Sequence, residues 1–348
     1  MNIDNLTPFS AECLPFMNAA NEDTVLVVVA GRFALPNPAD GFHEGELLVH
    51  PDQRSVPLCD VYTGQPGRSS LYWEGQASCA RPGTDVYLHG HAQAPRGVPV
   101  TDLDISIRVG QMERRARVFG DRVWRRGLWG LRPSEPTPFV QMPLCYERCL
   151  GGWFPQASTR DATAIDRNPI GCGLYASARE AEGQPLPNLE DPQALIRSPE
   201  DRPLPQGFGP LARGWMPRRR FSGRFDSKWQ AEQAPLWPSD TDSQFFSAAV
   251  PGMCCTPHLL GGEEVSLLGL HAEGPLRFRL PSYLLVSKLR FAGYTLRQLL
   301  RLEAIMFELH QSSLTMIWRA NLPIRQSLLA LRACIVRVVA QWEQCQAT

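Results

Sequence analysis

Three histidine and cysteine spacings in the sequence could bind a metal ion: His89-Gly-His91, Cys145-x3-Cys149 and Cys254-Cys255-x2-His258. Zinc sites use imidazole and thiolate ligands, and His89 and His91 would project from one face of a strand. A metal site also needs a third ligand, and the sequence offers neither an assignable one nor a Cys-x2-Cys pair. We therefore interpret these residues as core or surface side chains, and we predict no metal and no cofactor.

Two other patterns contain the residue types of a chemical motif but lack the sequence context that the motif requires. Gly171-Cys-Gly173-Leu-Tyr-Ala176 fits GxGxxA, but Arg167-Asn-Pro169 precedes it where a dinucleotide site requires a hydrophobic strand. Cys145 could be a nucleophile, but no base can be assigned to it. Glu147 and Arg148 are more simply an ion pair. We therefore predict that the chain is not an enzyme, with a hydrolase of carbohydrate or peptide as the alternative.

A basic run, Arg218-Arg-Arg220, lies among four aromatic residues between positions 215 and 229. Such a pattern could stack and hold a nucleic acid strand. However, 35 Lys and Arg balance 35 Asp and Glu, so the chain has no overall field that would attract a polyanion. Arginine and aromatic side chains are also enriched at protein interfaces. We therefore predict no nucleic acid partner and treat residues 207–229 as a candidate protein-binding segment.

The elements that must position these residues are short, because chain breakers are frequent. The sequence contains 31 Pro and 28 Gly, which favours short strands joined by ordered loops. Residues 24–30 form a β-branched run typical of a buried strand, and residues 102–109 alternate apolar and polar side chains. The sequence therefore predicts a mainly β fold of antiparallel β-sandwich-like lobes, with a loop-rich middle segment and few short helices.

The pattern divides the chain into three parts, which we expect to form one continuous domain. Residues 1–130 are predicted to form an N-terminal β-sandwich-like lobe. Residues 131–262 are predicted to form a loop-rich middle segment, and residues 263–348 are predicted to form a C-terminal β region that packs on the rest. Local predictions are hairpins around Gly120-Asp121 and over 302–319, helices at 226–233 and 284–301, and a mobile exposed excursion at 183–206.

The opening residues of the chain lack the basic and apolar regions of a secretory signal. The longest apolar run, residues 25–30, is too short to cross a bilayer. We therefore expect a cytoplasmic protein without a membrane partner, whose cysteines are reduced.

A series of short phrases along nearly the whole chain resembles the domain-of-unknown-function family 2169. The phrases are Asp85-Val with Gly90-x-Ala92, Met142-Pro-Leu144, Tyr146-Glu-Arg148 with Gly151-Gly152, Asn168-Pro169 with Gly171 and Gly173, and Gly207-Phe-Gly-Pro210 with Trp215 and Arg218. Each phrase is short, and their number and order make the resemblance specific.

The resemblance implies an accessory role in type VI secretion, as a non-enzymatic adaptor or chaperone. Its partner would be an effector (toxin) protein that it helps to load onto the spike, with the spike protein as a second candidate partner. A scaffold protein without cargo is a further alternative. The candidate protein-binding residues are Arg167, Asn168, Trp215, Arg218 and Arg219.

The chain departs from the family pattern at residues 245–258. The family has a phrase resembling FN.APPDQ there, whereas this chain has Phe245-Phe-Ser-Ala-Ala-Val-Pro251 followed by Gly-Met-Cys-Cys255. If this loop contacts the cargo, we expect the specificity of this chain to differ from that of its relatives.

Overall fold

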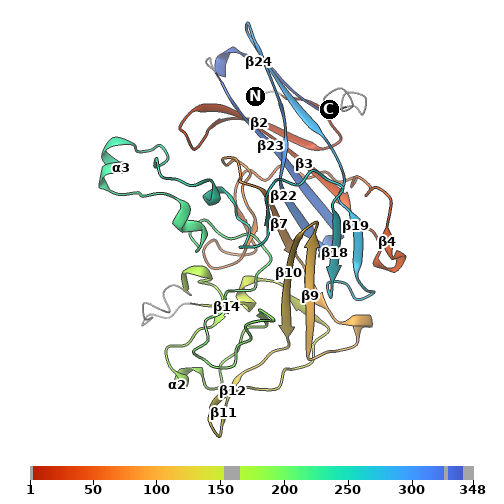
Figure 1. Cartoon of the computed structure of the whole chain (residues 1–348), viewed down its shortest axis with the longest axis vertical. Coiled ribbons are helices and arrows are strands. Elements are labelled where there is room, and N and C mark those ends of the chain that lie inside the picture. The colour runs from red at the N-terminus through yellow and green to blue at the C-terminus, as the bar shows by residue number, and fades with distance from the viewer. Residues whose placement is uncertain (1–2, 153–164, 325–327, 340–348) are drawn as a thin grey trace.

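The computed structural model describes residues 3–152, 165–324 and 328–339. The described chain is elongated and built mainly of β-strands, with β24 near one end and the β11–β12 hairpin at the other (Figure 1). In these ranges no helix combines the length and the apolar character needed to cross a membrane.

The central sheet has six strands in the order β17-β7-β22-β23-β3-β2. These are β17 (Cys254–Cys255), β7 (Thr84–His89), β22 (Arg301–Glu308), β23 (Ser313–Pro323), β3 (Asp23–Ala34) and β2 (Ser10–Met17). Along β3, Val25 and Val27 belong to one buried cluster and Leu26 and Val28 to another. Because neighbouring side chains of a strand point to opposite faces, this sheet is covered on both sides.

Two further sheets complete the main framework. One has six strands: β16 (Leu189–Glu190), β10 (Met112–Phe119), β9 (Asp102–Val109), β18 (Glu264–Leu268), β19 (Leu276–Arg279) and β4 (Phe42–His43). The other has four: β1 (Ile3–Leu6), β24 (Leu331–Val338), β20 (Leu285–Phe291) and β21 (Thr295–Leu299). Ile107 of β9 and Leu289 of β20 are buried in the same cluster as Val27, so all three sheets share one core.

Short elements occupy the remaining chain. Four two-stranded pairs are β5 (Val61–Tyr62) with β6 (Leu71–Trp73), β8 (His91–Gln93) with β13 (Gln141–Pro143), β11 (Trp124–Gly127) with β12 (Gly130–Pro133), and β14 (Leu150–Gly151) with β15 (Cys172–Gly173). The helices are α2 (Ala178–Ala181) and α3 (Ser227–Glu232), with 3-10 turns η1 (Pro38–Asp40), η2 (Pro95–Gly97), η3 (Tyr146–Arg148), η4 (Arg218–Phe221), η5 (Ser243–Phe246), η6 (Leu309–Gln311) and η7 (Leu328–Ala330).

The predicted mainly β class is confirmed, and several local predictions hold. Residues 24–30 lie within β3, residues 102–109 form β9, and α3 falls inside the predicted helix at 226–233. The hairpin over 302–319 is the antiparallel pair of β22 and β23. These elements carry strong local signals, either a continuous β-branched run or a period of two.

Three local predictions were wrong. Residues 284–301 form β20 and β21 instead of a helix, and the alternating burial along β20 has the period of a strand. The predicted turn at Gly120-Asp121 makes no hairpin, because β10 pairs with β9 and β16, whereas the next strand, β11, pairs with β12. The predicted exposed excursion at 183–206 is anchored in the core, where residues 186–190 are buried and Glu190 forms a buried ion pair with Arg122.

The predicted boundaries at 130 and 262 do not coincide with sheet boundaries. β3 pairs with β23, and β9 pairs with β18, so strands from the first and last thirds of the chain share both six-stranded sheets. Four C-terminal strands, β18, β19, β22 and β23, therefore lie inside sheets of the predicted N-terminal lobe, while β20, β21 and β24 form the third sheet with β1.

A cluster of six buried charged side chains joins the middle segment (residues 131–262) to the central sheet. Its members, none more than 3% exposed, are Glu74, Arg81, Asp85, Arg218, Glu303 and Arg319. Three carboxylates and three guanidinium groups balance in charge, as burial requires. We call this set the buried charge cluster.

Glu74 links Arg81 to Arg218 within the buried charge cluster. Its carboxylate accepts a hydrogen bond from Arg81 at 2.6 Å and pairs with Arg218 on the other side. Burial raises the pKa of Glu74, but Arg218 and Arg81 outweigh this effect and hold the pKa at about 2. The carboxylate is therefore ionised at neutral pH.

The substitution Glu74→Gln should lower the free energy of unfolding by about 3–5 kcal/mol, because it leaves an uncompensated buried guanidinium charge. Urea titration at pH 7 measures this loss. The matched control is Glu264→Gln, whose carboxylate pairs with Arg279 at 2.6 Å while both side chains are more than half exposed. The control should cost less than about 1 kcal/mol. Equal losses in both variants would contradict the central role of Glu74.

Candidate protein-binding groove

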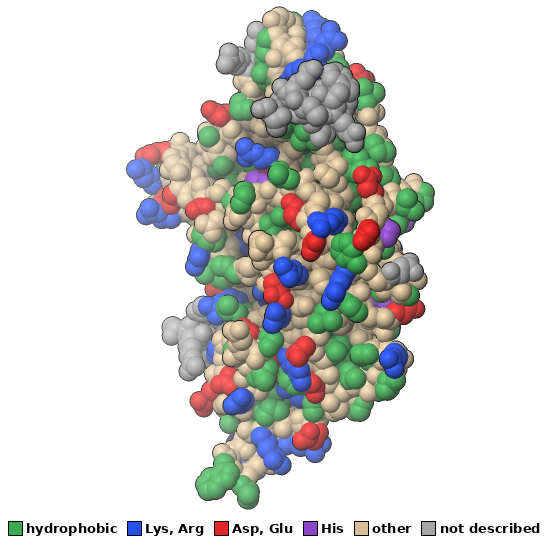
Figure 2. Space-filling model, turned by 45° about the vertical axis from the view of Figure 1, so that its right-hand side comes forward, with side chains coloured by type: hydrophobic (Ala, Val, Ile, Leu, Met, Phe, Trp, Pro, Cys, Tyr) green, Lys and Arg blue, Asp and Glu red, His purple; other side chains and the backbone are tan. Residues whose placement is uncertain are grey.

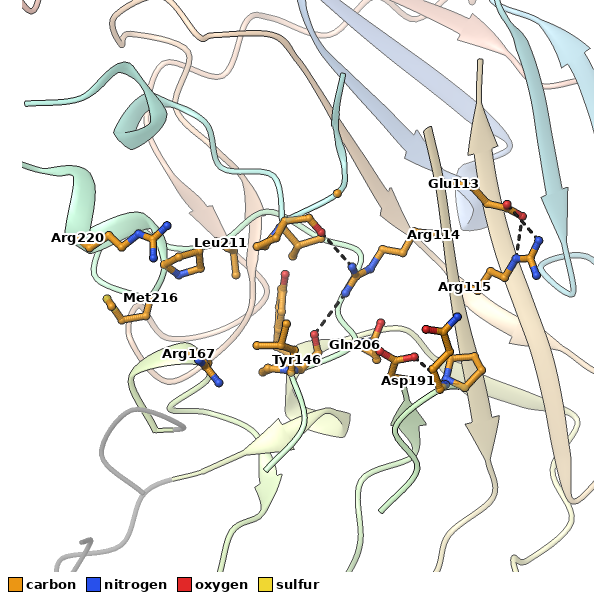
Figure 3. A pocket seen from close by; sticks show the side chains of 18 residues that line it. Glu113, Arg114, Arg115, Tyr146, Arg167, Asp191, Gln206, Leu211, Met216 and Arg220 are labelled. Carbon is orange, nitrogen blue, oxygen red and sulfur yellow. Dashed lines mark hydrogen bonds and ion pairs between the residues drawn. The ribbon is translucent and has the colours of Figure 1, made fainter. Parts of the chain in front are cut away.

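A cleft of about 770 Å³ opens between β10 and loops of the middle segment (Figure 3). It shares Leu211, Pro217, Arg220 and Val250 with a neighbouring hollow of about 480 Å³, so the two form one continuous depression. We call it the arginine groove. Its lining comes mainly from residues 113–115, 191–193, 204–220 and 243–256, together with Pro82, Tyr146 and Arg167.

Arg114 on β10 holds the two walls of the arginine groove together. Its Nε donates to the Gly207 carbonyl at 3.0 Å, while Nη1 and Nη2 donate to the carbonyls of Pro251 and Pro205, each at 3.3 Å. Its guanidinium also lies 5.6 Å from the ring centroid of Phe208. Burial lowers the pKa of Arg114, and no described carboxylate lies within ion-pair distance. A cation is therefore held at the groove by neutral backbone oxygens.

The other charged groups leave the groove cationic. Arg115 pairs with Glu113 at 2.9 Å, and Asp191 accepts a hydrogen bond from the Gln193 backbone. In the larger cleft four arginines thus lie beside two carboxylates, and the neighbouring hollow adds the paired Arg218. The local field of such a groove favours an anionic partner.

The side chains of two of these arginines, Arg167 and Arg220, have no hydrogen-bond or ion-pair partner in the described part of the chain. Arg220 lies 4.5 Å from the ring centroid of Phe221, which orients its guanidinium without neutralising it. Figure 3 shows Arg167 and Arg220 on one side of the groove, with Tyr146 and Leu211 between them and Arg114.

Apolar side chains form much of the remaining lining, namely Leu204, Leu211, Met216, Pro217 and Val250. Leu204 is 53% exposed although its neighbour Gln206 is buried. A cleft that combines apolar surface with unpaired cations suits a protein segment that carries apolar and acidic side chains.

Of the five predicted binding residues, Arg167 and Arg219 lie at the surface. Arg167 is half-buried in the groove lining, and Arg219 pairs with Asp166 at 2.5 Å with its side chain half exposed. Both side chains are accessible, and their contact with a partner stays a prediction.

The other three predicted residues are buried and make internal contacts instead. Asn168 donates to the backbone carbonyls of Tyr146 and Leu150, at 2.8 and 3.1 Å. Trp215 packs edge-to-face on Tyr146 at a centroid distance of 5.2 Å. Arg218 belongs to the buried charge cluster. These side chains fix the loops behind the groove, and they offer a partner little surface.

The basic run that could have bound nucleic acid is divided by the fold. Arg218 is buried, Arg219 is paired with Asp166, and Arg220 faces the groove. The three guanidinium groups therefore do not form one continuous basic strip, which a strand of nucleic acid would require.

Arg114 and Arg220 were not among the five candidate residues, although Arg220 belongs to the basic run 218–220. One signal for Arg114 was available, because it shares the inward parity of β10 with Ala116 and Val118, both fully buried. An arginine at an inward position of an alternating strand indicates either a buried partner or a cleft. No local signal distinguishes Arg220 from Arg219.

The residues first considered for metal binding or catalysis pack and hydrogen-bond within the fold. His89 is buried, stacks on Tyr72 at 4.3 Å and has its Nε2 2.8 Å from the Tyr72 carbonyl. Burial raises the pKa of Cys145 to about 11, which keeps this thiol protonated at neutral pH. Among the described residues, no group of three His, Cys, Asp or Glu could hold a metal ion.

The predicted ion pair between Glu147 and Arg148 was wrong. Glu147 accepts hydrogen bonds from the backbone and hydroxyl of Ser70, at 2.8 and 2.6 Å. Arg148 pairs with Asp121 at 3.2 Å instead. The two side chains therefore tie η3 to two different neighbours.

Comparison with known proteins places the chain in a family. A family model described as "Uncharacterized protein conserved in bacteria (DUF2169)" matches residues 20–319, so the chain belongs to this family. The match includes every residue of the arginine groove. Searches of curated proteins and of solved structures gave no match.

Gly207→Ala should destabilise the fold by about 1–3 kcal/mol, because a Cβ there would lie 2.1 Å from the Tyr146 ring. The control Gly214→Ala has no atom within 4 Å of the added carbon and should change stability by less than about 0.5 kcal/mol. Urea unfolding of both variants measures the difference. A neutral Gly207→Ala would show that Tyr146 does not fix the shape of the groove.

The stability of the protein should fall as the pH drops from 6.5 towards 4. Burial lowers the pKa of His89 to about 4, so the unfolded chain binds a proton there at a pH where the folded chain does not. This shift corresponds to a loss of up to about 3 kcal/mol. His89→Gln should reduce the dependence of the free energy of unfolding on pH, whereas the exposed control His271→Gln should retain this dependence. Urea midpoints at pH 7, 5.5 and 4.5 test this, and an unchanged pH dependence in His89→Gln would contradict it.

Proposed function

We propose that this chain is a non-enzymatic adaptor of a type VI secretion system, which binds an effector protein and helps to load it onto the spike. The family resemblance implies such an accessory role, and the arginine groove is the observation that carries the binding part of the proposal. The groove gives the adaptor a place to hold a segment of its effector.

The charges and surface of the groove indicate the kind of segment that would bind. Arg167 and Arg220, whose side chains are unpaired within the described residues, would pair with carboxylates, while Leu204 and Met216 offer apolar contact. A segment in which Asp or Glu alternates with apolar side chains meets both requirements. Covering such a segment before secretion would also limit its aggregation, as expected of a chaperone.

The walls of the groove are already fixed without a partner. Arg114 bridges the walls, and Asp85 of β7 accepts hydrogen bonds from the Ser247 hydroxyl at 2.6 Å and the Ala248 backbone at 2.9 Å. A preorganised surface loses little conformational entropy on binding, which favours affinity.

Residues 245–258, which depart from the family phrase, contribute to one wall. Val250, Pro251 and Gly252 line both parts of the groove. The divergent sequence therefore lies where it would contact the bound segment. We infer that this wall adapts the adaptor to its own effector.

Co-expression with the proteins encoded beside it, followed by affinity purification and size exclusion, tests the proposal. We expect a stable complex with a toxin-like neighbour, and loss of soluble toxin when this chain is omitted. If the chain elutes alone and every neighbour is soluble without it, the adaptor proposal fails.

The double substitution Arg167→Glu, Arg220→Glu should weaken this complex by about 10-fold or more, because it reverses both unpaired charges of the groove. Isothermal titration with the purified effector measures the change. The control Arg297→Glu reverses an exposed arginine on β21, outside the groove lining, and should bind as the unmodified protein does. Equal affinity of all three proteins would place the effector on another surface.

A further inference from the structure

The β11–β12 hairpin projects from one end of the molecule (Figure 1) and its tip is apolar and exposed. Its turn residues Leu128 and Trp129 are 98% and 100% exposed. Figure 2 shows hydrophobic side chains at the lowest point of the molecule, with basic side chains directly above them. A fully exposed tryptophan on a protruding turn is unfavourable in water and indicates a contact surface.

The chemistry of the turn is also unusual for a hairpin. Gly127 pairs with Gly130, so Leu128 and Trp129 form a two-residue turn. Neither residue has a positive φ, and Gly130 takes that conformation instead, with φ 123°. The backbone therefore requires no particular side chain at these two positions and does not account for a Leu-Trp pair.

Two uncompensated cations lie beside the tip. Arg125 and Arg132 are directly opposite each other in the hairpin, and like charges at such positions repel. Neither side chain has a hydrogen-bond or ion-pair partner within the described ranges, whereas the adjacent Arg126 pairs with Glu182. An external carboxylate near Arg125 and Arg132 would relieve the repulsion.

The base of the hairpin is firmly held. Trp124 is 1% exposed and belongs to a buried cluster with Leu150 and Leu186. Its backbone carbonyl accepts a hydrogen bond from Gly183 at 2.8 Å, and its N–H donates to Gln184 at 3.0 Å. The tip is thus presented on a fixed support, which lowers the entropic cost of docking.

We propose that this hairpin is a second docking element, which inserts Leu128 and Trp129 into an apolar pocket rimmed by carboxylates on a folded partner protein. Tryptophan and arginine are the residues that most often dominate the binding energy of protein interfaces. The hairpin contributes no residue to the arginine groove, so this contact is separate from the proposed effector site.

The surroundings of the tip favour a protein pocket over an anionic membrane. Glu182 is neutralised by Arg126 and Asp121 by Arg148, so Arg125 and Arg132 are the uncompensated charges beside the tip within the described ranges. Segments that bind anionic membranes carry clusters of about four to eight basic residues, which is more than this tip offers. A discrete pocket would meet only the tip and its two free arginines.

Fluorescence titration with each purified protein encoded beside this chain tests the proposal. Because the chain contains 9 tryptophans, the signal of Trp129 is isolated by subtracting spectra of Trp129→Phe. We expect one neighbour to shift the Trp129 emission to the blue and to protect it from acrylamide. Vesicles of phosphatidylglycerol should cause no shift. A shift of the Trp129 emission with the vesicles, or the absence of a shift with every neighbour, would overturn the proposal.

Affinities of matched variants give the second test. Leu128→Ser with Trp129→Ser should weaken binding to that neighbour by at least about 10-fold, and Arg125→Glu with Arg132→Glu should act in the same direction. The control Leu260→Ser changes a leucine that is 80% exposed elsewhere and should have no effect. The groove variant Arg167→Glu, Arg220→Glu should keep this affinity, which separates the hairpin from the effector site. Unchanged affinity of the Leu128→Ser, Trp129→Ser variant would refute the docking role.

Discussion

The carboxylate of Glu74, held between the guanidinium groups of Arg81 and Arg218, is the interaction on which the middle segment depends. Arg218 comes from that segment, while Arg81 precedes β7 of the central sheet. All three side chains are buried, so water cannot replace a missing partner. Removing one member of a buried charge group costs far more than the group adds to stability when complete. Detachment of the middle segment would therefore leave Glu74 without one of its two guanidinium partners.

In the loops, buried arginines donate the hydrogen bonds to backbone carbonyls that regular secondary structure would otherwise supply. A loop carbonyl that is buried outside a sheet needs a donor, and one guanidinium supplies five N–H groups. Arg319 donates to the carbonyls of Gln76 and Ser78, and Arg218 donates to those of Phe245 and Leu211. Long irregular segments are fixed in this way, and a fixed groove can form between them.

The arginine groove and the β11–β12 hairpin differ in shape and in exposure. The groove is concave and joins unpaired cations to apolar walls, whereas the hairpin is convex and ends in Leu128 and Trp129. In the proposed adaptor, the groove would hold a segment of the effector and the hairpin would enter a pocket of a second folded protein. Two separate surfaces allow one chain to bind two partners at once, as loading onto a spike requires.

The mainly β class and the family membership follow from the sequence by itself, because alternation in 102–109 and short Gly/Pro phrases are local signals. The sequence also directed attention to Arg167, although it could not distinguish this half-buried arginine of the groove from the fully buried Arg218. Only the tertiary structure decided that Arg218 meets Glu74, 144 residues away, and that Arg114 reaches Pro251, 137 residues away. Whether a charged side chain is buried, or free to bind, depends on partners that are distant in the chain, and no local spacing encodes them.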